Sequence, residues 1–259
     1  MPFADAAGTR LFHRFDGPVG APPLVLSNSL GTNVGMWDDQ IPALAERFRV
    51  LRYDSRGHGQ SAVPPGPYRI EELGRDLIAL LDALDIPRVR FCGLSKGGMV
   101  GMWLASNAPE RVERLVLCNT SAHLPGRELW NARIEAVRTS GMAAVAPQVL
   151  ERWFTPEFRA RAPEAVEKIR QMLLTTPAAG YAACCEAIRD MDQRETIASI
   201  RAPTLVVVGS RDPATPPEHG RAIADRIRGA KVVELPAAHL SNVEAAEGFT
   251  AAVVDFLSG

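Results

Sequence analysis

Residues 89–98 read V-R-F-C-G-L-S-K-G-G, and this stretch decides how the rest of the chain is interpreted. An apolar run that begins at Val89 leads into Gly93-Leu94-Ser95-Lys96-Gly97, and a helix-compatible run follows. A turn this tight strains the backbone of its central residue, and side chains two positions to either side would collide, so glycine is needed there. The serine hydroxyl then projects from the edge of a sheet, above a helix N-terminus. Because glycine and serine are common in loops, the pattern G-x-S-x-G carries weight only in this strand–turn–helix context.

The size and charge of the chain exclude several classes of protein. Its 259 residues are 46% hydrophobic with a net charge of −1, which suits one globular domain or a core with an insert. Near-neutral charge gives no general reason to bind nucleic acid or an anionic membrane. No apolar run approaches the ~20 residues of a membrane span, and the N-terminus lacks the pattern of a secretory signal, so we expect a cytoplasmic protein.

The cysteines have neither a disulfide nor a metal-ligand spacing. Cys92 and Cys118 lie in apolar strands, whereas Cys184 and Cys185 are adjacent. We interpret all four as small buried hydrophobic side chains in a reducing compartment, and we expect no metal site.

Short apolar strands alternate with helical patterns along most of the chain. The expected strands are 24–26, 49–53, 89–92, 112–118, 205–208 and 231–235, with a further antiparallel edge strand near 9–15. The expected helices are 36–44, 70–84, 97–107, 217–227 and 244–257. This alternation predicts an α/β fold with a mostly parallel sheet that is covered on both faces.

One stretch breaks the alternation. Residues 122–195 contain no convincing strand, and their helical patterns are interrupted by prolines at 125, 147, 156, 163 and 177. We therefore predict a helical cap at 122–195, inserted between two parts of one core at 1–121 and 196–259.

A serine nucleophile requires a base, and the base requires an orienting carboxylate. The pattern G-x-S-x-G between a strand and a helix is the nucleophile elbow of serine hydrolases, in which acid and then histidine follow the serine along the chain. His239 follows the strand at 231–235 by a short loop, at the sheet edge where such sites lie. His219 starts a helix and is better explained as a surface residue, so His239 is the expected base.

The acid is chosen by the same criterion. Asp212 follows the strand at 205–208, between Ser95 and His239 in sequence. Asp190 and Asp192 belong to the insert and are better explained as solvated charges. Some hydrolases place the acid one strand earlier, but Cys118-Asn119-Thr120 offers no carboxylate there.

Two backbone N–H groups are expected to stabilise the oxyanion of the reaction. One is the N–H of Lys96, directly after the nucleophile at a helix N-terminus. The other comes from the loop Ser27-Asn28-Ser29-Leu30-Gly31-Thr32 after the first parallel strand. We expect the Leu30 N–H to be this donor, with Ser29 as the nearest rival and as a candidate substrate contact.

With these pieces the chain resembles the α/β-hydrolase family over essentially its whole length. The segment D-S-R-G-H-G-Q-S at 54–61 is similar to that family's D-x-R-G-H-G-x-S loop, and we interpret it as structural. The resemblance implies an eight-stranded, mostly parallel sheet flanked by helices, with an inserted helical cap. It also implies catalysis by Ser95, Asp212 and His239 without a cofactor.

Several segments are similar to one branch of this family, the 3-oxoadipate enol-lactonases. They are L-S-N-S-L-G-T at 26–32, L-R-Y-D at 51–54, F-C-G-L-S at 91–95, L-C-N-T at 117–120, W-N-A-R-I at 130–134 and E-R-W-F-T-P at 151–156. The resemblance implies hydrolysis of 3-oxoadipate enol-lactone to 3-oxoadipate, a step in the bacterial degradation of aromatic compounds. Lys96 departs from the apolar residue expected after the nucleophile.

Such a lactone carries a free carboxylate, which needs a cation once it is desolvated. Trp130 and Arg133 are three apart and share a helix face, so Arg133 could pair with the carboxylate while Trp130 packs on the ring. An exposed arginine beside a packed tryptophan explains the same spacing equally well. Lys96 is a second candidate cation if its side chain turns toward the substrate.

Other functions on this scaffold stay open at this stage. They are a general carboxylesterase, another lactonase, a carbon–carbon bond hydrolase, a cofactor-free haloperoxidase and a non-catalytic ligand receptor. Ser95 argues against dehalogenases and epoxide hydrolases, which use an aspartate there. The sequence leaves open whether the chain forms a homo-oligomer.

Overall fold

The computed structural model describes residues 2–6 and 8–259. Its strands are β1 (Phe3–Ala6), β2 (Thr9–Asp16), β3 (Pro23–Ser27), β4 (Arg49–Tyr53), β5 (Val89–Leu94), β6 (Val112–Cys118), β7 (Thr204–Gly209) and β8 (Lys231–Leu235). They form one eight-stranded sheet in the order β1-β2-β4-β3-β5-β6-β7-β8, as the family resemblance implies. Pairing is antiparallel from β1 through β2 to β4 and parallel from β4 to β8.

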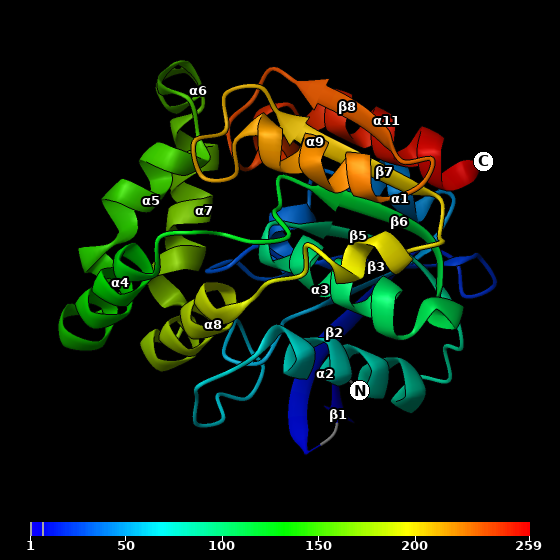
Figure 1. The fold of residues 1–259 in the computed structure, drawn as a ribbon, viewed down its shortest axis with the longest axis horizontal. Coiled ribbons are helices and arrows are strands. Elements are labelled where there is room, and N and C mark those ends of the chain that lie inside the picture. Colours follow the sequence, from blue (N-terminus) through cyan, green and yellow to red (C-terminus); the bar gives the residue numbers. More distant parts are fainter. Residues whose placement is uncertain (1, 7) are drawn as a thin grey trace.

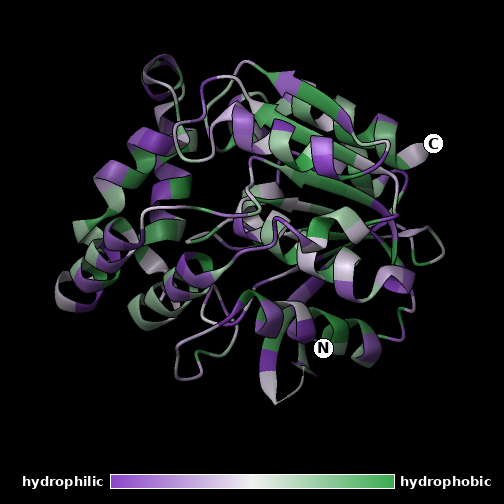
Figure 2. Cartoon of the chain, in the orientation of Figure 1, coloured by the Kyte–Doolittle hydropathy of each residue, from purple (hydrophilic) through white to green (hydrophobic). Residues whose placement is uncertain are grey.

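Helices cover both faces of the sheet (Figure 1). Those of the core are α1 (Ile41–Ala45), α2 (Ile70–Ala83), α3 (Lys96–Asn107), α9 (Pro217–Arg226), α10 (Ser241–Glu244) and α11 (Ala246–Ser258), with short 3-10 helices η1 (Val34–Trp37), η2 (Pro109–Arg111) and η4 (Thr196–Ser199). Helices α2, α3 and α9 lie on one face, and α1 and α11 on the other. Burial on both faces explains the continuous apolar runs in the central strands, where β7 is buried throughout. Figure 2 shows these strands as the hydrophobic centre of the core.

The segment between β6 and β7 is mostly helical, and its helices lie beyond the carboxyl ends of the parallel strands (Figure 1). They are α4 (Arg127–Ser140), η3 (Met142–Ala144), α5 (Ala146–Trp153), α6 (Pro156–Arg161), α7 (Pro163–Thr175) and α8 (Ala178–Asp190). We call residues 122–195 the cap. Prolines occupy the first turns of α5, α6 and α7, where a missing N–H costs no helical hydrogen bond. Three of the five prolines that interrupt the helical pattern, at 147, 156 and 163, therefore mark where helices begin.

Two predicted helices are each divided in the structure. The stretch 36–44 forms η1 and α1, because Asn33 caps η1 and Pro42 lies in the first turn of α1. The stretch 244–257 is broken at Ala245, whose φ of −123° and ψ of 47° separate α10 from α11. Alanine favours helix, so the sequence does not signal this second break.

The N-terminal hairpin corrects one detail of the predicted sheet. Strand β2 pairs antiparallel with β4 as expected, but it is not the edge, because β1 pairs with its outer side. The exposed edges are thus β1 and β8. Neither edge affects the ends of β3, β5, β6 and β7, where the candidate site lies.

Candidate active site

Ser95 occupies the strained turn that the sequence predicts between β5 and α3. Its φ of 56° and ψ of −116° lie in a region that residues other than glycine rarely adopt. A Cβ on Gly93 would lie 2.3 Å from Gly97 O, and one on Gly97 would lie 2.0 Å from Ser27 O. The Ser95 N–H donates to Cys118 O at 2.8 Å, and the Thr120 hydroxyl donates to Ser95 O at 2.7 Å. Strand β6 and the loop that follows it thus hold the turn in its strained conformation.

Asp212 and His239 come together at the ends of β7 and β8. His239 Nδ1 lies 2.8 Å from Asp212 Oδ2. The Ala214 and Thr215 N–H groups donate to Asp212 Oδ1 at 2.8 and 3.0 Å, and the Thr215 hydroxyl donates to Oδ2 at 2.7 Å. Burial alone would raise the pKa of the Asp212 carboxyl, but the charge of His239 and these hydrogen bonds hold that pKa below its ordinary value. Asp212 therefore stays ionised and accepts a hydrogen bond from the Nδ1–H group of His239. With the proton on Nδ1, the Nε2 atom of His239 is free to act as a base.

Ser95 and His239 line the same cavity, between the sheet edge and the cap. No hydrogen bond joins Ser95 Oγ to the imidazole within the described residues. Such contacts are often long until a substrate is bound. The structure thus places the three predicted residues in one site, with the acid–base contact already formed.

Asn119 is a member of the site that the sequence did not reveal. It follows β6 at the position where some hydrolases carry the acid, with a left-handed φ of 42°. Its amide Nδ2 donates to Asp212 Oδ2 at 3.0 Å and to Ala238 O at 3.2 Å, and Oδ1 accepts from the Ser241 hydroxyl at 2.5 Å. The amide therefore connects the acid to the loop that carries His239.

The N–H groups of Leu30 and Lys96 have no hydrogen-bond partner in the part of the chain that the structure describes. In contrast, the Ser29 N–H donates to Met36 Sδ at 3.3 Å, and the Gly31 N–H donates to His58 Nε2 at 2.9 Å. Leu30 lines the same cavity as Ser95, and Lys96 follows Ser95 directly, so two unpaired N–H groups beside the serine can stabilise a developing oxyanion. The contact of Ser29 with Met36 makes it the weaker candidate for the second donor.

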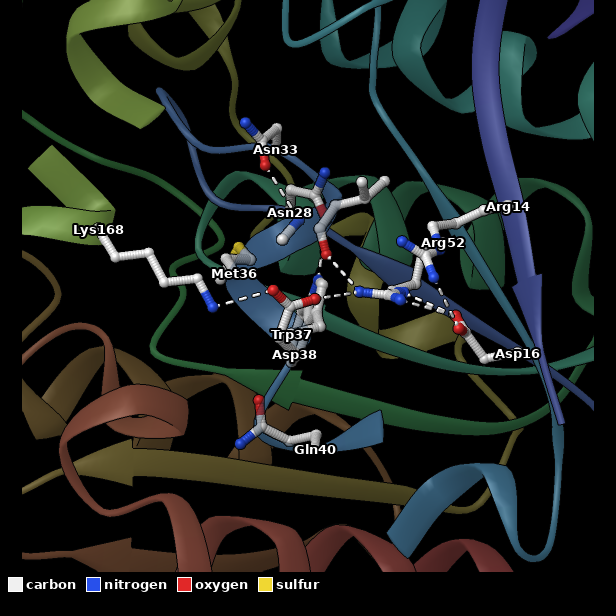
Figure 3. A network of polar contacts seen from close by, with 12 residues as sticks. Arg14, Asp16, Asn28, Asn33, Met36, Trp37, Asp38, Gln40, Arg52 and Lys168 are labelled. Carbon is white, nitrogen blue, oxygen red and sulfur yellow. Dashed lines mark hydrogen bonds and ion pairs between the residues drawn. The ribbon is translucent and has the colours of Figure 1, made fainter. Parts of the chain in front are cut away.

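A buried polar network fixes the loop that carries Leu30. Trp37 Nε1 donates to Asn28 Oδ1 at 2.8 Å, and Asn28 Nδ2 donates to Tyr53 O at 2.8 Å. Figure 3 shows the Asn28–Trp37 contact beside the guanidinium of Arg52, which lies between Asp16 and Asp38. Asn28 therefore serves as a structural anchor of the loop.

Lys96 is not among the residues that line the cavity, so the condition for its role as a second substrate cation, a side chain turned toward the substrate, is not met. The Lys96 side chain is buried, and its ammonium donates to the hydroxyl of Ser55 in the loop that follows β4. Burial lowers the pKa of Lys96, and burial together with the Lys96 charge lowers the pKa of His58 well below its ordinary value. His58 is therefore neutral and accepts the Gly31 N–H, in agreement with a structural interpretation of the loop at 54–61.

The cap supplies most of the cavity wall. The lining residues are Ser29, Leu30, Ser95, Met99, Leu124, Pro125, Leu129, Trp130, Arg133, Val149, Arg152, Trp153, Tyr181, Ile188, Ala214, Thr215 and His239. Trp130 and Arg133 both face the cavity, and the Arg133 guanidinium carbon lies 5.0 Å from the Trp130 ring centroid. The Ser29 hydroxyl is buried with no hydrogen-bond partner among the described residues. It is thus available to a bound molecule.

Two further polar residues of this wall escaped the sequence argument. Arg152 lines the cavity from α5, and Tyr181 from α8. Burial raises the pKa of the Tyr181 hydroxyl, and the neighbouring charge of Arg133 partly offsets that rise. Neither Arg133 nor Arg152 forms an ion pair with a carboxylate of the described residues, whereas other cap arginines do. The spacing W-x-x-R could point to Arg133, but no local pattern identifies Arg152 or Tyr181.

No group of three or more His, Cys, Asp or Glu side chains that could hold a metal ion occurs within residues 2–6 and 8–259. Over the same residues, no helix has the length and apolar character to cross a membrane. The four cysteines are free and buried.

Comparisons with known proteins agree with this geometry. A family model described as the alpha/beta hydrolase fold matches residues 22–246. The chain is 44% identical over 237 residues to 3-oxoadipate enol-lactonase 2 of Acinetobacter baylyi, covering 92% of this chain and 89% of that protein. The crystal structure of the enol-lactonase from Burkholderia xenovorans LB400 superposes with a TM-score of 0.98 at 48% identity, covering 100% of both chains. A thermophilic esterase from Thermogutta terrifontis, with malate bound, gives a TM-score of 0.92 at 31% identity, covering 100% of this chain and 97% of that one.

Proposed function

The chain belongs to the α/β-hydrolase family, and from this premise we propose that it hydrolyses 3-oxoadipate enol-lactone to 3-oxoadipate with Ser95, His239 and Asp212 as its catalytic triad. One observation carries the choice of substrate. The cavity that holds Ser95 and His239 also holds two guanidinium groups, of Arg133 and Arg152, that pair with no carboxylate of the described chain. A cavity with surplus positive charge suits a substrate that bears a carboxylate.

The reaction begins with attack of Ser95 Oγ on the lactone carbonyl carbon while His239 Nε2 takes the hydroxyl proton. Asp212 accepts the bond from Nδ1 and stabilises the imidazolium that forms. The N–H groups of Lys96 and Leu30 donate to the carbonyl oxygen as it becomes an oxyanion. The interactions of these groups with the substrate become stronger in the transition state, because charge develops on the oxyanion and on the imidazole there.

Collapse of the tetrahedral intermediate opens the ring. The ring oxygen leaves as an enol and receives its proton from His239, so the acyl chain stays attached to Ser95. The enol oxygen is a better leaving group than an alkoxide. Water that is activated by His239 then releases the acid, and the enol tautomerises to the ketone. No cofactor takes part in any of these steps.

The cap orients the substrate. Arg133 pairs with the free carboxylate and Trp130 packs against the ring, while the Ser29 and Tyr181 hydroxyls offer further hydrogen bonds. Arg152 adds a second positive charge to the same wall. We place this activity in the degradation of aromatic compounds, as the sequence resemblance to the 3-oxoadipate enol-lactonases implies.

A spectrophotometric assay tests the proposal directly. Purified protein should abolish the ultraviolet absorbance of the enol-lactone, with 3-oxoadipate as the product. We expect kcat/KM for the lactone to exceed that for p-nitrophenyl acetate by about 100-fold, because a carboxylate–arginine contact contributes ~2–3 kcal/mol. Equal rates on both substrates would instead identify a general carboxylesterase, and the Ser95→Ala protein is the control for background hydrolysis.

A further inference from the structure

The two residues that flank His239 are both attached to one short segment of the cap. The Leu240 N–H donates to Trp153 O at 3.1 Å. On the other side, the Ala238 N–H donates to Glu244 Oε2 at 3.0 Å, and the same oxygen accepts the Thr155 N–H at 3.2 Å. The cap segment 153–155 thus contacts the histidine loop directly at Leu240 and through Glu244 at Ala238.

Glu244 ends the short helix α10, and its side chain is buried between the core and the cap. Its Oε1 accepts the hydroxyl proton of Thr155, whose Oγ1 also accepts the Phe158 N–H at 3.2 Å and so caps α6. Arg161 donates to the Glu244 backbone oxygen at 3.2 Å, but no basic side chain among the described residues lies within ion-pair distance of the carboxylate. A buried carboxylate without a cation is costly and depends on its hydrogen-bond donors. Here the donors are Ala238 of the core and Thr155 of the cap.

The Glu244 carboxylate joins the His239 loop to the cap segment 153–155, and both of these segments face the cavity. Trp153 is part of the cavity wall, and His239 lines the same cavity. We propose that Glu244 is a positioning residue, because its carboxylate holds the His239 loop and the Trp153 wall in fixed register with each other. This inference rests on the proposed role of His239 as the base, but not on which ester or lactone is the substrate.

A second link between cap and core provides a matched control. Lys168 of α7 donates to Asp38 Oδ2 at 2.9 Å, as Figure 3 shows, and both side chains are about half exposed. This ion pair also joins cap to core, but neither residue contacts the histidine loop. A role limited to attaching the cap predicts similar behaviour when either link is removed, whereas a positioning role predicts that only the Glu244 link affects turnover.

The experiment measures kcat and KM for p-nitrophenyl acetate with Glu244→Gln, Thr155→Val, Thr155→Ser, the Glu244→Gln/Thr155→Val double variant and Lys168→Met. Circular dichroism and thermal unfolding establish the folded fraction of each protein. We expect kcat to fall about 10-fold or more in Glu244→Gln and several-fold in Thr155→Val, with KM for this small ester within two-fold. Thr155→Ser keeps the hydroxyl and should restore kcat, and the double variant should be no slower than Glu244→Gln. Lys168→Met should keep the wild-type kcat.

A kcat for folded Glu244→Gln within two-fold of the wild type would overturn the proposal, as would fully additive losses in the double variant. If Glu244→Gln does not fold, the Thr155 pair decides, because equal kcat values in Thr155→Val and Thr155→Ser also contradict the proposal. The acetate ester needs the triad but no carboxylate site. Wild-type turnover of this ester without turnover of the enol-lactone would therefore reject the proposed substrate and leave the test of Glu244 intact.

Discussion

The sheet edge and the cap meet at one cavity, but the chain fixes their side chains in different ways. Ser95, Asp212 and His239 are 7%, 3% and 3% exposed. The Ser95 N–H donates to Cys118 O at the end of β6, and the Ser210 N–H before Asp212 donates to Leu235 O at the end of β8. The cap contributes Arg133 from α4, a helix in which only Ile134 and Val137 are buried. This contrast predicts that substitutions at the sheet edge lower kcat, whereas substitutions in the cap wall change KM for the substrate.

The largest expected effect tests the core side of this comparison. Ser95→Ala removes the nucleophile, so kcat should fall by roughly 10⁴-fold or more, since triad members act as a unit. Binding of the substrate should change little, because the cap wall is intact. Stopped-flow turnover measures kcat, and equilibrium binding of the product measures whether the binding site is intact. A Ser95→Ala protein that keeps a tenth of the wild-type kcat would contradict the assignment of the nucleophile.

The cap side predicts the opposite signature. Arg133→Met should raise KM for the enol-lactone by about 10-fold or more, with a smaller change in kcat, because a charge-assisted hydrogen bond contributes ~1.5–3 kcal/mol. KM for p-nitrophenyl acetate, which has no carboxylate, should stay the same. Arg127→Met is the control, since Arg127 lies on the same helix but pairs with Asp190 outside the cavity wall. An unchanged KM for the lactone would remove Arg133 from the site and leave Arg152 as the candidate.

A smaller effect concerns the buried cation of Lys96. Lys96→Met replaces an ammonium that has no carboxylate within ion-pair distance among the described residues, so the free energy of unfolding at pH 7 should rise by about 1–2 kcal/mol. Burial lowers the pKa of Lys96 in the folded state below the ordinary value of 10.5. Between these two pKa values the unfolded chain binds more protons, so the wild type should gain stability as pH rises through that window.

Urea denaturation across that pH range checks this expectation. The stability difference between Lys96→Met and the wild type should shrink as the pH increases. Parallel stability curves for the two proteins would show that the ammonium is not penalised by burial.

The smallest effect is expected at the exposed link between cap and core. Lys168→Met breaks the ion pair with Asp38, and because both side chains are well exposed it should cost less than about 1 kcal/mol of stability. Added salt should weaken the wild type toward the variant. A loss of several kcal/mol, measured by thermal unfolding, would show that the cap depends on its surface contacts.

Much of the site could be predicted because it depends on local sequence. The turn at Ser95 is specified by glycines two positions to either side, and Asp212 and His239 each follow a recognisable apolar strand by a short loop. Parallel strands bring their ends to one edge, so order along the chain translates into proximity. The alternation of strands and helices likewise predicted the sheet, apart from the outer strand β1.

Other features depend on contacts between segments far apart in sequence. The helix break at Ala245 occurs next to Glu244, which contacts Thr155, 89 residues earlier. No sequence pattern in either segment predicts this contact. In the sequence, Asn119 shows only that no carboxylate follows strand β6. The fold places its amide between Asp212 and Ala238. The sequence allowed the Lys96 side chain to turn toward the substrate, and only the fold shows that it bonds to Ser55 and does not line the cavity.

By itself, the sequence determined the parallel sheet, the strained turn at Ser95 and the positions of Asp212 and His239 after successive strands, because periodicity and glycine placement act over a few residues. Only the tertiary structure decided the cavity wall: which cap side chains face Ser95, that Arg152 and Tyr181 join Arg133 there, and that Glu244 links the cap to the His239 loop. The physical reason is that burial and hydrogen-bond partners belong to pairs of segments. The sequence pattern of one segment does not show which other segment it will contact.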